Sequence, residues 1–351
     1  MTGEATNRTI AFASTIVVVA VTFSLLVLGR DLLIPIAVAI MIWYLLNALA
    51  KGFNSLPLKK FQIPGWASMT LAIITVLIGV ALIAELISDN ISQVSAAAPV
   101  YQANIELLVK KASQIAGFEK PPDIAAIFGQ IDLRLLATRF AAATASFAGN
   151  FGIVLIYVLF LLFEQNGFHK KLHALFPDET RREEIESLLK RMQKQIQTYV
   201  AIKTLTSLMT GLISYIILLM VGVDFAEFWG FIIFLLNYIP TVGSLLGIIF
   251  PALLTLIQFA NPVPFFIVLG SIGSIQFIIG NIIEPRLTGS SLNISPLVVI
   301  LSLALWGSIW GIVGMFLCVP LTVIAMIIFS YFDRTRPLAI LLSGNGKIET
   351  Q

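Results

Sequence analysis

The chain has 351 residues, of which 58% are hydrophobic and 12% are charged, and its net charge is +3. A soluble domain carries about 25% charged residues, so this composition excludes an ordinary soluble protein and indicates a chain that crosses a membrane several times. The single cysteine, Cys318, excludes an intramolecular disulfide and a cysteine-based metal site. We therefore expect an all-α integral membrane protein surrounded by membrane lipids.

Residues 1–88 contain three apolar segments long enough to cross a membrane as helices, at about 10–29, 32–50 and 66–88. The first is longer than the apolar core of a signal peptide and has no small-residue cleavage site after it, so we expect it to be retained. Pro35 falls in the first turn of the second segment, where its missing N–H costs little. This part of the chain is predicted to form three N-terminal transmembrane helices.

The pattern changes at residues 89–146, where acidic and basic side chains are balanced. Apolar residues recur at helical spacing in its first part, and Pro121 and Pro122 interrupt that spacing. Asp132 is a candidate N-cap for a second amphipathic helix that ends near Phe140. We predict a small extracytoplasmic helical cap at 89–146, followed by a fourth transmembrane helix at 147–164.

Residues 165–203 are the most charged part of the chain and are predicted to form a basic amphipathic helix in the cytoplasm. Thr180 and Glu183 fit a capping box that would start this helix. The helix is either a solvated linker to the fifth transmembrane segment or a coupling or oligomer-contact element. His169 and His173 lack the H-E-x-x-H pattern, so we expect a solvated pair and no metal site.

Lysine and arginine are concentrated at 51–60, 170–203 and 334–336, whereas the loop with Asp224 and Glu227 has none. Because cytoplasmic loops of membrane proteins are enriched in basic residues, these three regions are predicted to face the cytoplasm. Alternating transmembrane segments then place both termini in the cytoplasm, including a tail at 333–351. The cap and the Asp224 loop are expected on the outer side.

Residues 204–332 form the predicted transport core, in which two apolar runs, 228–259 and 297–329, are too long for single transmembrane helices. The first is interrupted by Asn237-Tyr-Ile-Pro-Thr-Val-Gly243 and the second by Trp306-Gly-Ser-Ile-Trp-Gly-Ile-Val-Gly314. Irregular backbone at membrane depth needs protein or a water-filled cavity around it, so each interruption predicts a broken or re-entrant helical hairpin. The alternative for the first is a plain helix-turn-helix at the surface. In total we expect about eight transmembrane segments.

An apolar segment at 263–283 precedes Glu284 and Arg286, the only acidic and basic side chains from residue 228 to residue 332. Charges near hydrocarbon are costly and commonly functional, although both could instead lie among lipid headgroups at a helix end. Pro285 is expected to end the helix at Glu284. Four residues have the spacing of one face of this helix: Gly273, Gln276, Gly280 and Glu284. We place Glu284 on the transport pathway and Arg286 at the headgroups or in a local pair.

The candidate solute or ion pathway combines the two interruptions with the end of the 263–283 helix. Its members are Asn237, Tyr238, Pro240, Thr241, Gly243, Gln276, Asn281, Glu284, Pro285, Arg286, Gly307, Gly311 and Gly314. The amide and hydroxyl side chains offer neutral hydrogen bonds to a polar solute. Glu284, together with carbonyl groups freed near Pro240, could instead hold a monovalent cation. The glycines of the second interruption permit close backbone approach or a tight turn.

Several classes of protein are excluded by missing motifs. The sequence has no Gly-x4-Gly-Lys-Ser/Thr phosphate loop, so ATP coupling within this chain is not expected. It has no Gly-x-Gly-Asp motif of an intramembrane protease, and both histidines fall outside the apolar segments, so we predict no enzymatic activity. We expect no cofactor, no metal and no nucleic acid partner. A secondary transporter is the remaining prediction, with an uncoupled channel or scaffold as the alternative.

At these residues the chain resembles the autoinducer-2 exporter family of bacterial inner-membrane transporters. The resemblance covers nearly the whole chain and is most specific at 234–247, from Gln276 through Glu284-Pro-Arg-Leu-Thr-Gly289, and at 297–320. It implies an integral membrane transporter with about eight spans, a periplasmic segment between the third and fourth, and homo-oligomerisation. Members of this family are associated with export of the autoinducer-2 quorum signal, and others with exchange of sodium or lithium for protons. The resemblance therefore implies transport of a small polar solute or a monovalent cation.

Overall fold

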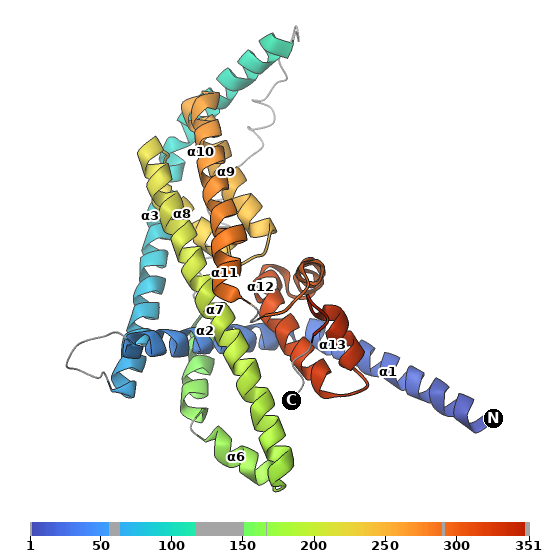
Figure 1. The fold of residues 1–351 in the computed structure, drawn as a ribbon. Helices are drawn as coiled ribbons and strands as arrows, with labels where there is room; N and C mark the ends of the chain where they lie inside the picture. The colour runs from blue at the N-terminus through green and yellow to red at the C-terminus, as the bar shows by residue number, and fades with distance from the viewer. Residues whose placement is uncertain (1, 56–63, 117–150, 166, 290–291, 348–351) are drawn as a thin grey trace. The chain divides into compact units, whose positions relative to one another are not determined.

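The computed structural model describes residues 2–55, 64–116, 151–165, 167–289 and 292–347, and helices make up nearly all of this part of the chain (Figure 1). Six of the described helices are long and apolar enough to cross a membrane, by length and composition: Arg30–Ser55, Gly65–Leu86, Glu179–Val221, Val242–Phe259, Pro262–Thr288 and Pro296–Tyr331. Three shorter apolar helices are Ile16–Leu28, Phe151–Glu164 and Ala226–Leu236. An all-α protein with several apolar helices is confirmed, while the number of eight segments stays a prediction.

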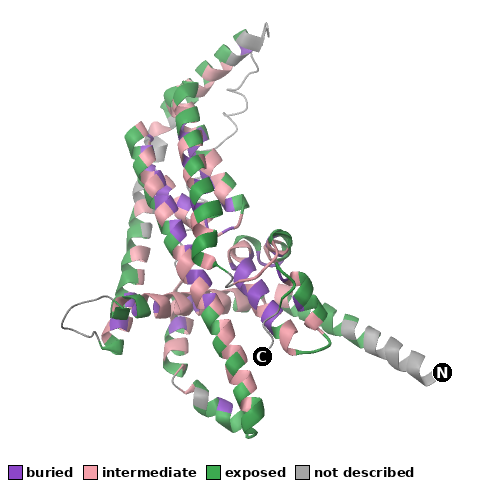
Figure 2. Ribbon diagram, viewed as in Figure 1, coloured by how far each residue is buried: buried purple, intermediate pink, exposed green. Residues whose placement is uncertain are grey.

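The chain divides into two compact units. The first unit comprises residues 1–43, 150–189 and 294–351, and the second comprises 44–149 and 190–293. Buried residues are spread along the helices of each unit (Figure 2). Many large apolar side chains on these helices are exposed. Exposed apolar faces suit helices surrounded by lipid, because hydrocarbon does not penalise them.

The first unit contains α1 (Thr2–Leu28), the start of α2 (Arg30–Ser55), α6 (Phe168–Leu175), α12 (Pro296–Tyr331) and α13 (Arg336–Leu342). Trp310 of α12 donates from Nε1 to the carbonyl oxygen of Leu26 at 3.0 Å, which gives that carbonyl near the end of α1 a partner. Apolar side chains of α1 and α2 pack around Trp310.

The second interruption is a real break within α12. Gly311 has φ 60° and ψ −141°, a backbone conformation that excludes most side chains, so two helical stretches meet there at a kink. A Cβ atom on Gly314 would overlap the carbonyl oxygen of Trp306. The close backbone approach expected from these glycines is therefore present, and only glycine fits at position 314.

The second unit is assembled from α3 (Gly65–Ala116), most of α7 (Glu179–Val221), α8 (Ala226–Leu236), α9 (Val242–Phe259) and α10 (Pro262–Ile278). α9 packs against α8 and α10, and α3 contacts α8 and α9. The core of this unit is an apolar cluster formed by Leu218, Val223, Ala226, Ile233, Ala252, Val268 and Ile272. The cluster holds the ends of α7 and α8 against α9 and α10.

Helix α3 continues without interruption beyond the apolar stretch that ends at Leu86. Its later part is tied to the core by Tyr101, which donates to Asp224 Oδ2 at 2.7 Å, and by Asn104, which donates to the Gln258 carbonyl oxygen at 2.8 Å. Burial and the neighbouring Asp224 carboxylate raise the pKa of Tyr101, so the phenol keeps the proton that it donates. The remainder of the predicted cap, including Pro121, Pro122 and Asp132, lies outside the described residues.

Helix α7 begins at Glu179, and Asp178 caps it by accepting a hydrogen bond from the Thr180 backbone N–H at 3.1 Å. The capping box of Thr180 and Glu183 is therefore wrong, although the helix starts within one residue of the expected position. The cap is shifted because Asp178 is itself a strong N-cap residue and precedes Thr180 in the chain. The helix then runs unbroken to Val221.

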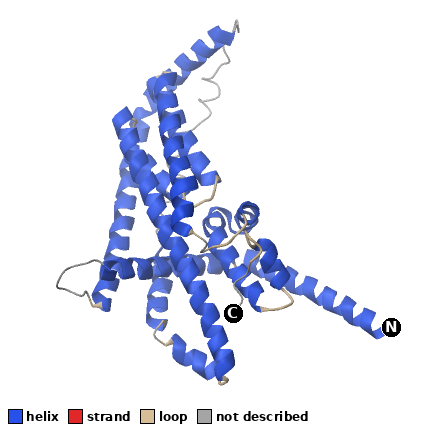
Figure 3. Cartoon of the chain, in the orientation of Figure 1, coloured by secondary structure: helices blue, strands red, loops and turns tan. Residues whose placement is uncertain are grey.

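The first interruption separates α8 from α9, and Figure 3 shows the connection between them as a loop. Thr241 has φ 61° and ψ −58°, and the Val242 N–H donates to the Pro240 carbonyl oxygen at 2.6 Å. These features define a classic γ-turn, a strained conformation that is uncommon for a β-branched residue. Two helices joined by a turn are thus confirmed, and backbone strain is concentrated at Thr241.

The helix that carries Glu284 does not end there. α10 passes into a π-helical turn, η1 (Ile279–Ile283), and then into α11 (Glu284–Thr288), so the helical path continues beyond Pro285. The predicted end at Glu284 is wrong because Pro285 lies in the first turn of α11, where no intrahelical N–H bond is lost. The π-turn also shifts the helical register, and Gly280 is exposed although Gln276 is buried. The predicted four-residue face is therefore not one continuous surface.

Candidate functional site

A stripe of buried polar side chains follows one face of α7 in the second unit. Lys203, Ser207, Thr210 and Ser214 recur at steps of three and four residues, and all four are buried. This spacing places them above one another on a helix. Buried polar groups in an apolar helix require partners, so the partners of this stripe define the candidate site.

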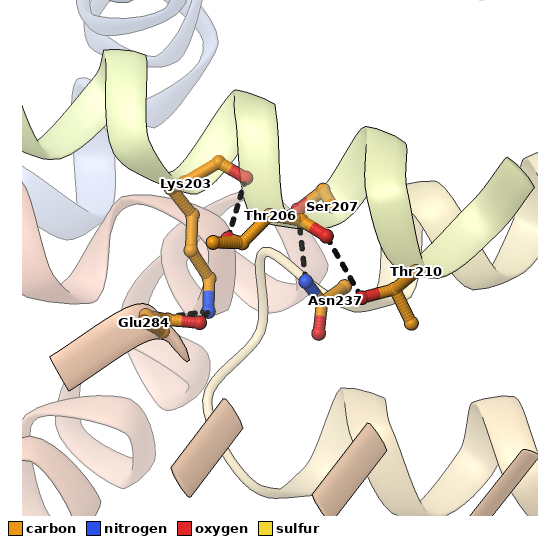
Figure 4. Close-up of polar contacts among 6 residues, drawn as sticks. All are labelled: Lys203, Thr206, Ser207, Thr210, Asn237 and Glu284. Atoms are coloured by element: carbon orange, nitrogen blue, oxygen red, sulfur yellow. Dashed lines mark hydrogen bonds and ion pairs between the residues drawn. The ribbon is translucent and has the colours of Figure 1, made fainter. Parts of the chain in front are cut away.

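The principal contact is an ion pair between α7 and α11. Lys203 Nζ lies 2.8 Å from Glu284 Oε1 and 3.0 Å from Oε2, so one ammonium group binds both carboxylate oxygens (Figure 4). The side chains are only 8% and 23% exposed. Removing two charges from water is costly, and the pair persists because each charge satisfies the other. Glu284 is therefore neutralised by Lys203, while Arg286 is exposed.

The helix break supplies the next contacts along the stripe. Asn237, directly after α8, donates from Nδ2 to Ser207 Oγ at 3.1 Å and is itself buried (Figure 4). The neighbouring Tyr238 hydroxyl donates to Thr204 Oγ1 at 2.7 Å. The start of the α8–α9 connection is therefore bound to α7 within one helical turn of Lys203. A movement of either α7 or the α8–α9 connection would alter both hydrogen bonds.

Gln276 of α10 contributes a buried amide to the same unit. Its side chain is 6% exposed, and its Nε2 atom has no hydrogen-bond partner among the described residues. Gly247 of α9 lies directly against it, because a Cβ atom at that position would be 3.1 Å from Nε2. Gln276 therefore occupies a tight contact between α9 and α10, and neither N–H of its amide has a partner among the described residues.

The predicted pathway residues separate into four groups. Asn237, Tyr238 and Glu284 make polar contacts with α7, and Gln276 is buried against α9. Pro240 and Thr241 lie in the turn between α8 and α9, and Gly243 lies in the first turn of α9. Asn281, Pro285 and Arg286 are exposed, and Asn281 donates to the Phe277 carbonyl oxygen of its own helix. The glycines Gly307, Gly311 and Gly314 belong to the first unit.

Lys203, Ser207 and Thr210 were not among the predicted pathway residues. Lys203 was assigned to the cytoplasmic basic helix because it closes a run of lysine and arginine. The signal that could have identified it is the continuation of the polar spacing, from Lys203 to Ser207, Thr210 and Ser214, into an otherwise apolar helix. A charged residue that begins such a stripe differs from one on a solvated face.

Comparison with known proteins agrees with this picture of a membrane transporter. The profile of the AI-2E family transporters matches residues 14–334. The chain belongs to the AI-2E transporter family. The resemblance found in the sequence is therefore confirmed over nearly the whole chain.

Three relatives show how this AI-2E protein compares with other members. The "AI-2 transport protein TqsA" of Escherichia coli is 27% identical over 91% of each chain. The "Putative transport protein YhhT" of Escherichia coli is 29% identical over 91% of this chain and 90% of the relative. A "Putative transport protein" of Borreliella burgdorferi is 35% identical, but over only 57% of this chain and 55% of the relative.

The chemistry available to this AI-2E protein follows from the groups in the site. Among the described residues, no cluster of three or more His, Cys, Asp or Glu side chains could hold a metal ion. The site instead offers one carboxylate, one ammonium group, several hydroxyls and two amides. These groups can form hydrogen bonds with a polar solute.

Proposed function

We propose that this protein is a secondary transporter of the bacterial inner membrane that exports a small polar solute, with autoinducer-2 as the candidate cargo. The family assignment supports transport, and the relative named for AI-2 transport matches over 91% of both chains. The observation that carries the proposal is the Lys203–Glu284 ion pair, buried beside a broken helix. Transporters use such breaks near the membrane centre to hold their substrates.

Proton coupling follows from the chemistry of this pair. When Glu284 is ionised, Lys203 holds α11 against α7. A proton on the carboxylate removes the charge that Lys203 binds, so the ammonium group loses its partner and the contact weakens. Asn237 and Tyr238 bind the α8–α9 connection to the same part of α7, so a shift of α7 also displaces this connection. The proton gradient thereby biases the helix arrangement on which solute passage depends.

A sodium or lithium/proton antiporter is the second candidate, and one observation favours it. The Lys203 ammonium group already occupies the cation position of the Glu284 carboxylate at 2.8 Å. A small monovalent cation could replace that ammonium group when α7 moves away. In this alternative the cation itself is the cargo, and the neutral groups of the site have only a structural role.

The test is transport by purified protein in proteoliposomes with an imposed proton gradient and autoinducer-2 as the probe. The wild type is expected to move autoinducer-2 at a rate that follows the gradient. Glu284→Gln should abolish this coupled flux while the protein still inserts and purifies. Glu227→Gln is the matched control, because Glu227 is an exposed acid of the same unit and its removal should leave the flux unchanged.

Each contrary outcome of this assay has a distinct meaning. Wild-type flux in Glu284→Gln would remove Glu284 from the mechanism. Autoinducer-2 flux that ignores the gradient would identify an uncoupled channel. Proton movement that requires sodium or lithium, with no autoinducer-2 flux, would establish the antiporter.

A further inference from the structure

The unpaired amide of Gln276 has no structural explanation in the fold. Roughly 90% or more of buried polar groups in proteins have a hydrogen-bond partner, so an orphan donor in a well-packed core is unusual. Gln276 Nε2 is fully buried and has no partner among the described residues, and the same is true of Ser214 Oγ and Trp229 Nε1 in this unit. The hydrogen bond that would offset its burial must therefore be made to something other than the described side chains and backbone.

The position of Gln276 is fixed from two sides. A Cβ atom on Gly247 would lie 3.1 Å from Gln276 Nε2 and 3.5 Å from Ile233 Cγ1, so the amide lies where α8, α9 and α10 meet. Just after Gln276, the helix changes to the π-turn Ile279–Ile283. Single π-turns inside α-helices occur frequently at functional sites. The donor is thus held in place at a point where its helix departs from regular geometry.

We propose that Gln276 is a solute-binding residue whose amide N–H donates a hydrogen bond to the transported solute. The inference rests on the proposed transporter function and specifies the class of cargo as a neutral solute with hydroxyl or carbonyl oxygens. A donor requires an acceptor oxygen on the solute. The charges of Lys203 and Glu284 cancel in their ion pair, so the polar stripe offers no net charge to an ionic solute.

If Gln276 binds the solute, removing its amide should raise the thermal stability of the solute-free protein and weaken the binding of autoinducer-2. Gln276→Met keeps the length of the side chain but removes the unpaired donor. Replacing an unsatisfied buried group by an apolar one is stabilising, so the Tm of the solute-free protein should rise by about 2–4 °C. The KM for autoinducer-2 should rise by about threefold to tenfold, the value of one lost hydrogen bond, with the maximal rate little changed.

The measurements are thermal unfolding in detergent, with and without autoinducer-2, and flux in proteoliposomes. Autoinducer-2 should raise the Tm of the wild type and have less effect on Gln276→Met, because a ligand stabilises the state that binds it. Thr255→Val is the matched control. Thr255 is fully buried in the same unit, but its hydroxyl is paired with the Ala252 carbonyl oxygen at 2.6 Å. This variant should lower the Tm slightly and leave KM unchanged.

Three results would overturn the proposal. A lower Tm in Gln276→Met with unchanged KM would show that the amide is paired within the folded protein, for example through a structural water. An unchanged KM with a raised Tm would show that the donor is unpaired but does not contact the solute. If the wild type neither moves nor binds autoinducer-2, the proposed cargo is wrong. If, in addition, the Tm of Gln276→Met is equal to or below that of the wild type, the proposed role of Gln276 is also wrong.

Discussion

Removing one partner of the Lys203–Glu284 ion pair should destabilise the protein more than replacing both partners together. Lys203→Met leaves an unpaired carboxylate, and Glu284→Gln leaves an unpaired ammonium group that is only 8% exposed. Each single change should lower the free energy of unfolding by about 3 kcal/mol, because an uncompensated buried charge remains. The double variant should lose clearly less than the sum of the two, since it buries neither charge. Chemical denaturation of the purified protein in detergent measures all three values.

Additive losses in that cycle would show that the two residues do not interact in the folded protein. Asp224→Asn provides a comparison, because Asp224 accepts a hydrogen bond from Tyr101 and no ion pair between described side chains involves it. Its loss should be about 1 kcal/mol and independent of Lys203.

Individual site residues differed in how far the sequence could predict them. Glu284 was identified because it is the only acid within a long apolar stretch, and Asn237 because it precedes Tyr-Ile-Pro. The partner of Glu284 could not be predicted, because Lys203 lies 81 residues away and only the packing of α7 against α11 joins them. The contact of Gln276 with Gly247 likewise depends on how α9 and α10 pack. Residue chemistry is local, whereas pairing is a property of the tertiary structure.

At the scale of elements, both helix interruptions were predicted, because proline and glycine act on the local backbone. The prediction was wrong at Pro285, which was expected to end the helix that contains Glu284. Proline is tolerated in the first turn of a helix, and the π-turn Ile279–Ile283 starts a new helical turn immediately before it. A π-turn has no clear sequence signal, so the end of this helix could not be located from the sequence.

The α8–α9 hairpin provides an element-scale prediction that rests on two glycines. Gly243→Ala should destabilise the second unit by about 3 kcal/mol or more, because its Cβ would overlap the Leu236 carbonyl oxygen and force the two helices apart. Gly270→Ala is the control, since nothing lies within 4 Å of its Cβ position inside α10. This change should raise stability by about 0.5–1 kcal/mol through helix propensity.

Thermal and chemical unfolding of purified Gly243→Ala and Gly270→Ala measure the two changes in stability. Equal effects of Gly243→Ala and Gly270→Ala would mean that the α8–α9 contact is looser than the structure indicates. Reduced transport in Gly243→Ala, with transport unchanged in Gly270→Ala, would further tie the close approach of α8 and α9 to function.

For the whole molecule, composition and charge placement carry most of the predictable information. The apolar content establishes a multi-pass membrane protein, and the structure describes six helices that are long enough to cross the bilayer. The predicted orientation depends on the preference for basic residues in cytoplasmic loops, which is a matter of charge placement and not of helix packing. The number of segments depends on whether each broken hairpin crosses the membrane or returns to its own side, and apolar length alone does not separate these cases.

Orientation is testable with single cysteines, because Cys318 is buried and is the only cysteine of the chain. In a Cys318→Ala background, Glu227→Cys should react with a membrane-impermeant maleimide added to spheroplasts, whereas Lys170→Cys should react only after permeabilisation. Both positions are exposed, so a difference in labelling reports the side of the membrane rather than burial. The reverse pattern would place the basic segment at 170–203 outside and invert the topology. Labelling of both positions in intact spheroplasts would place α8 and the basic segment on one side, which would contradict the unbroken helix α7 that connects them.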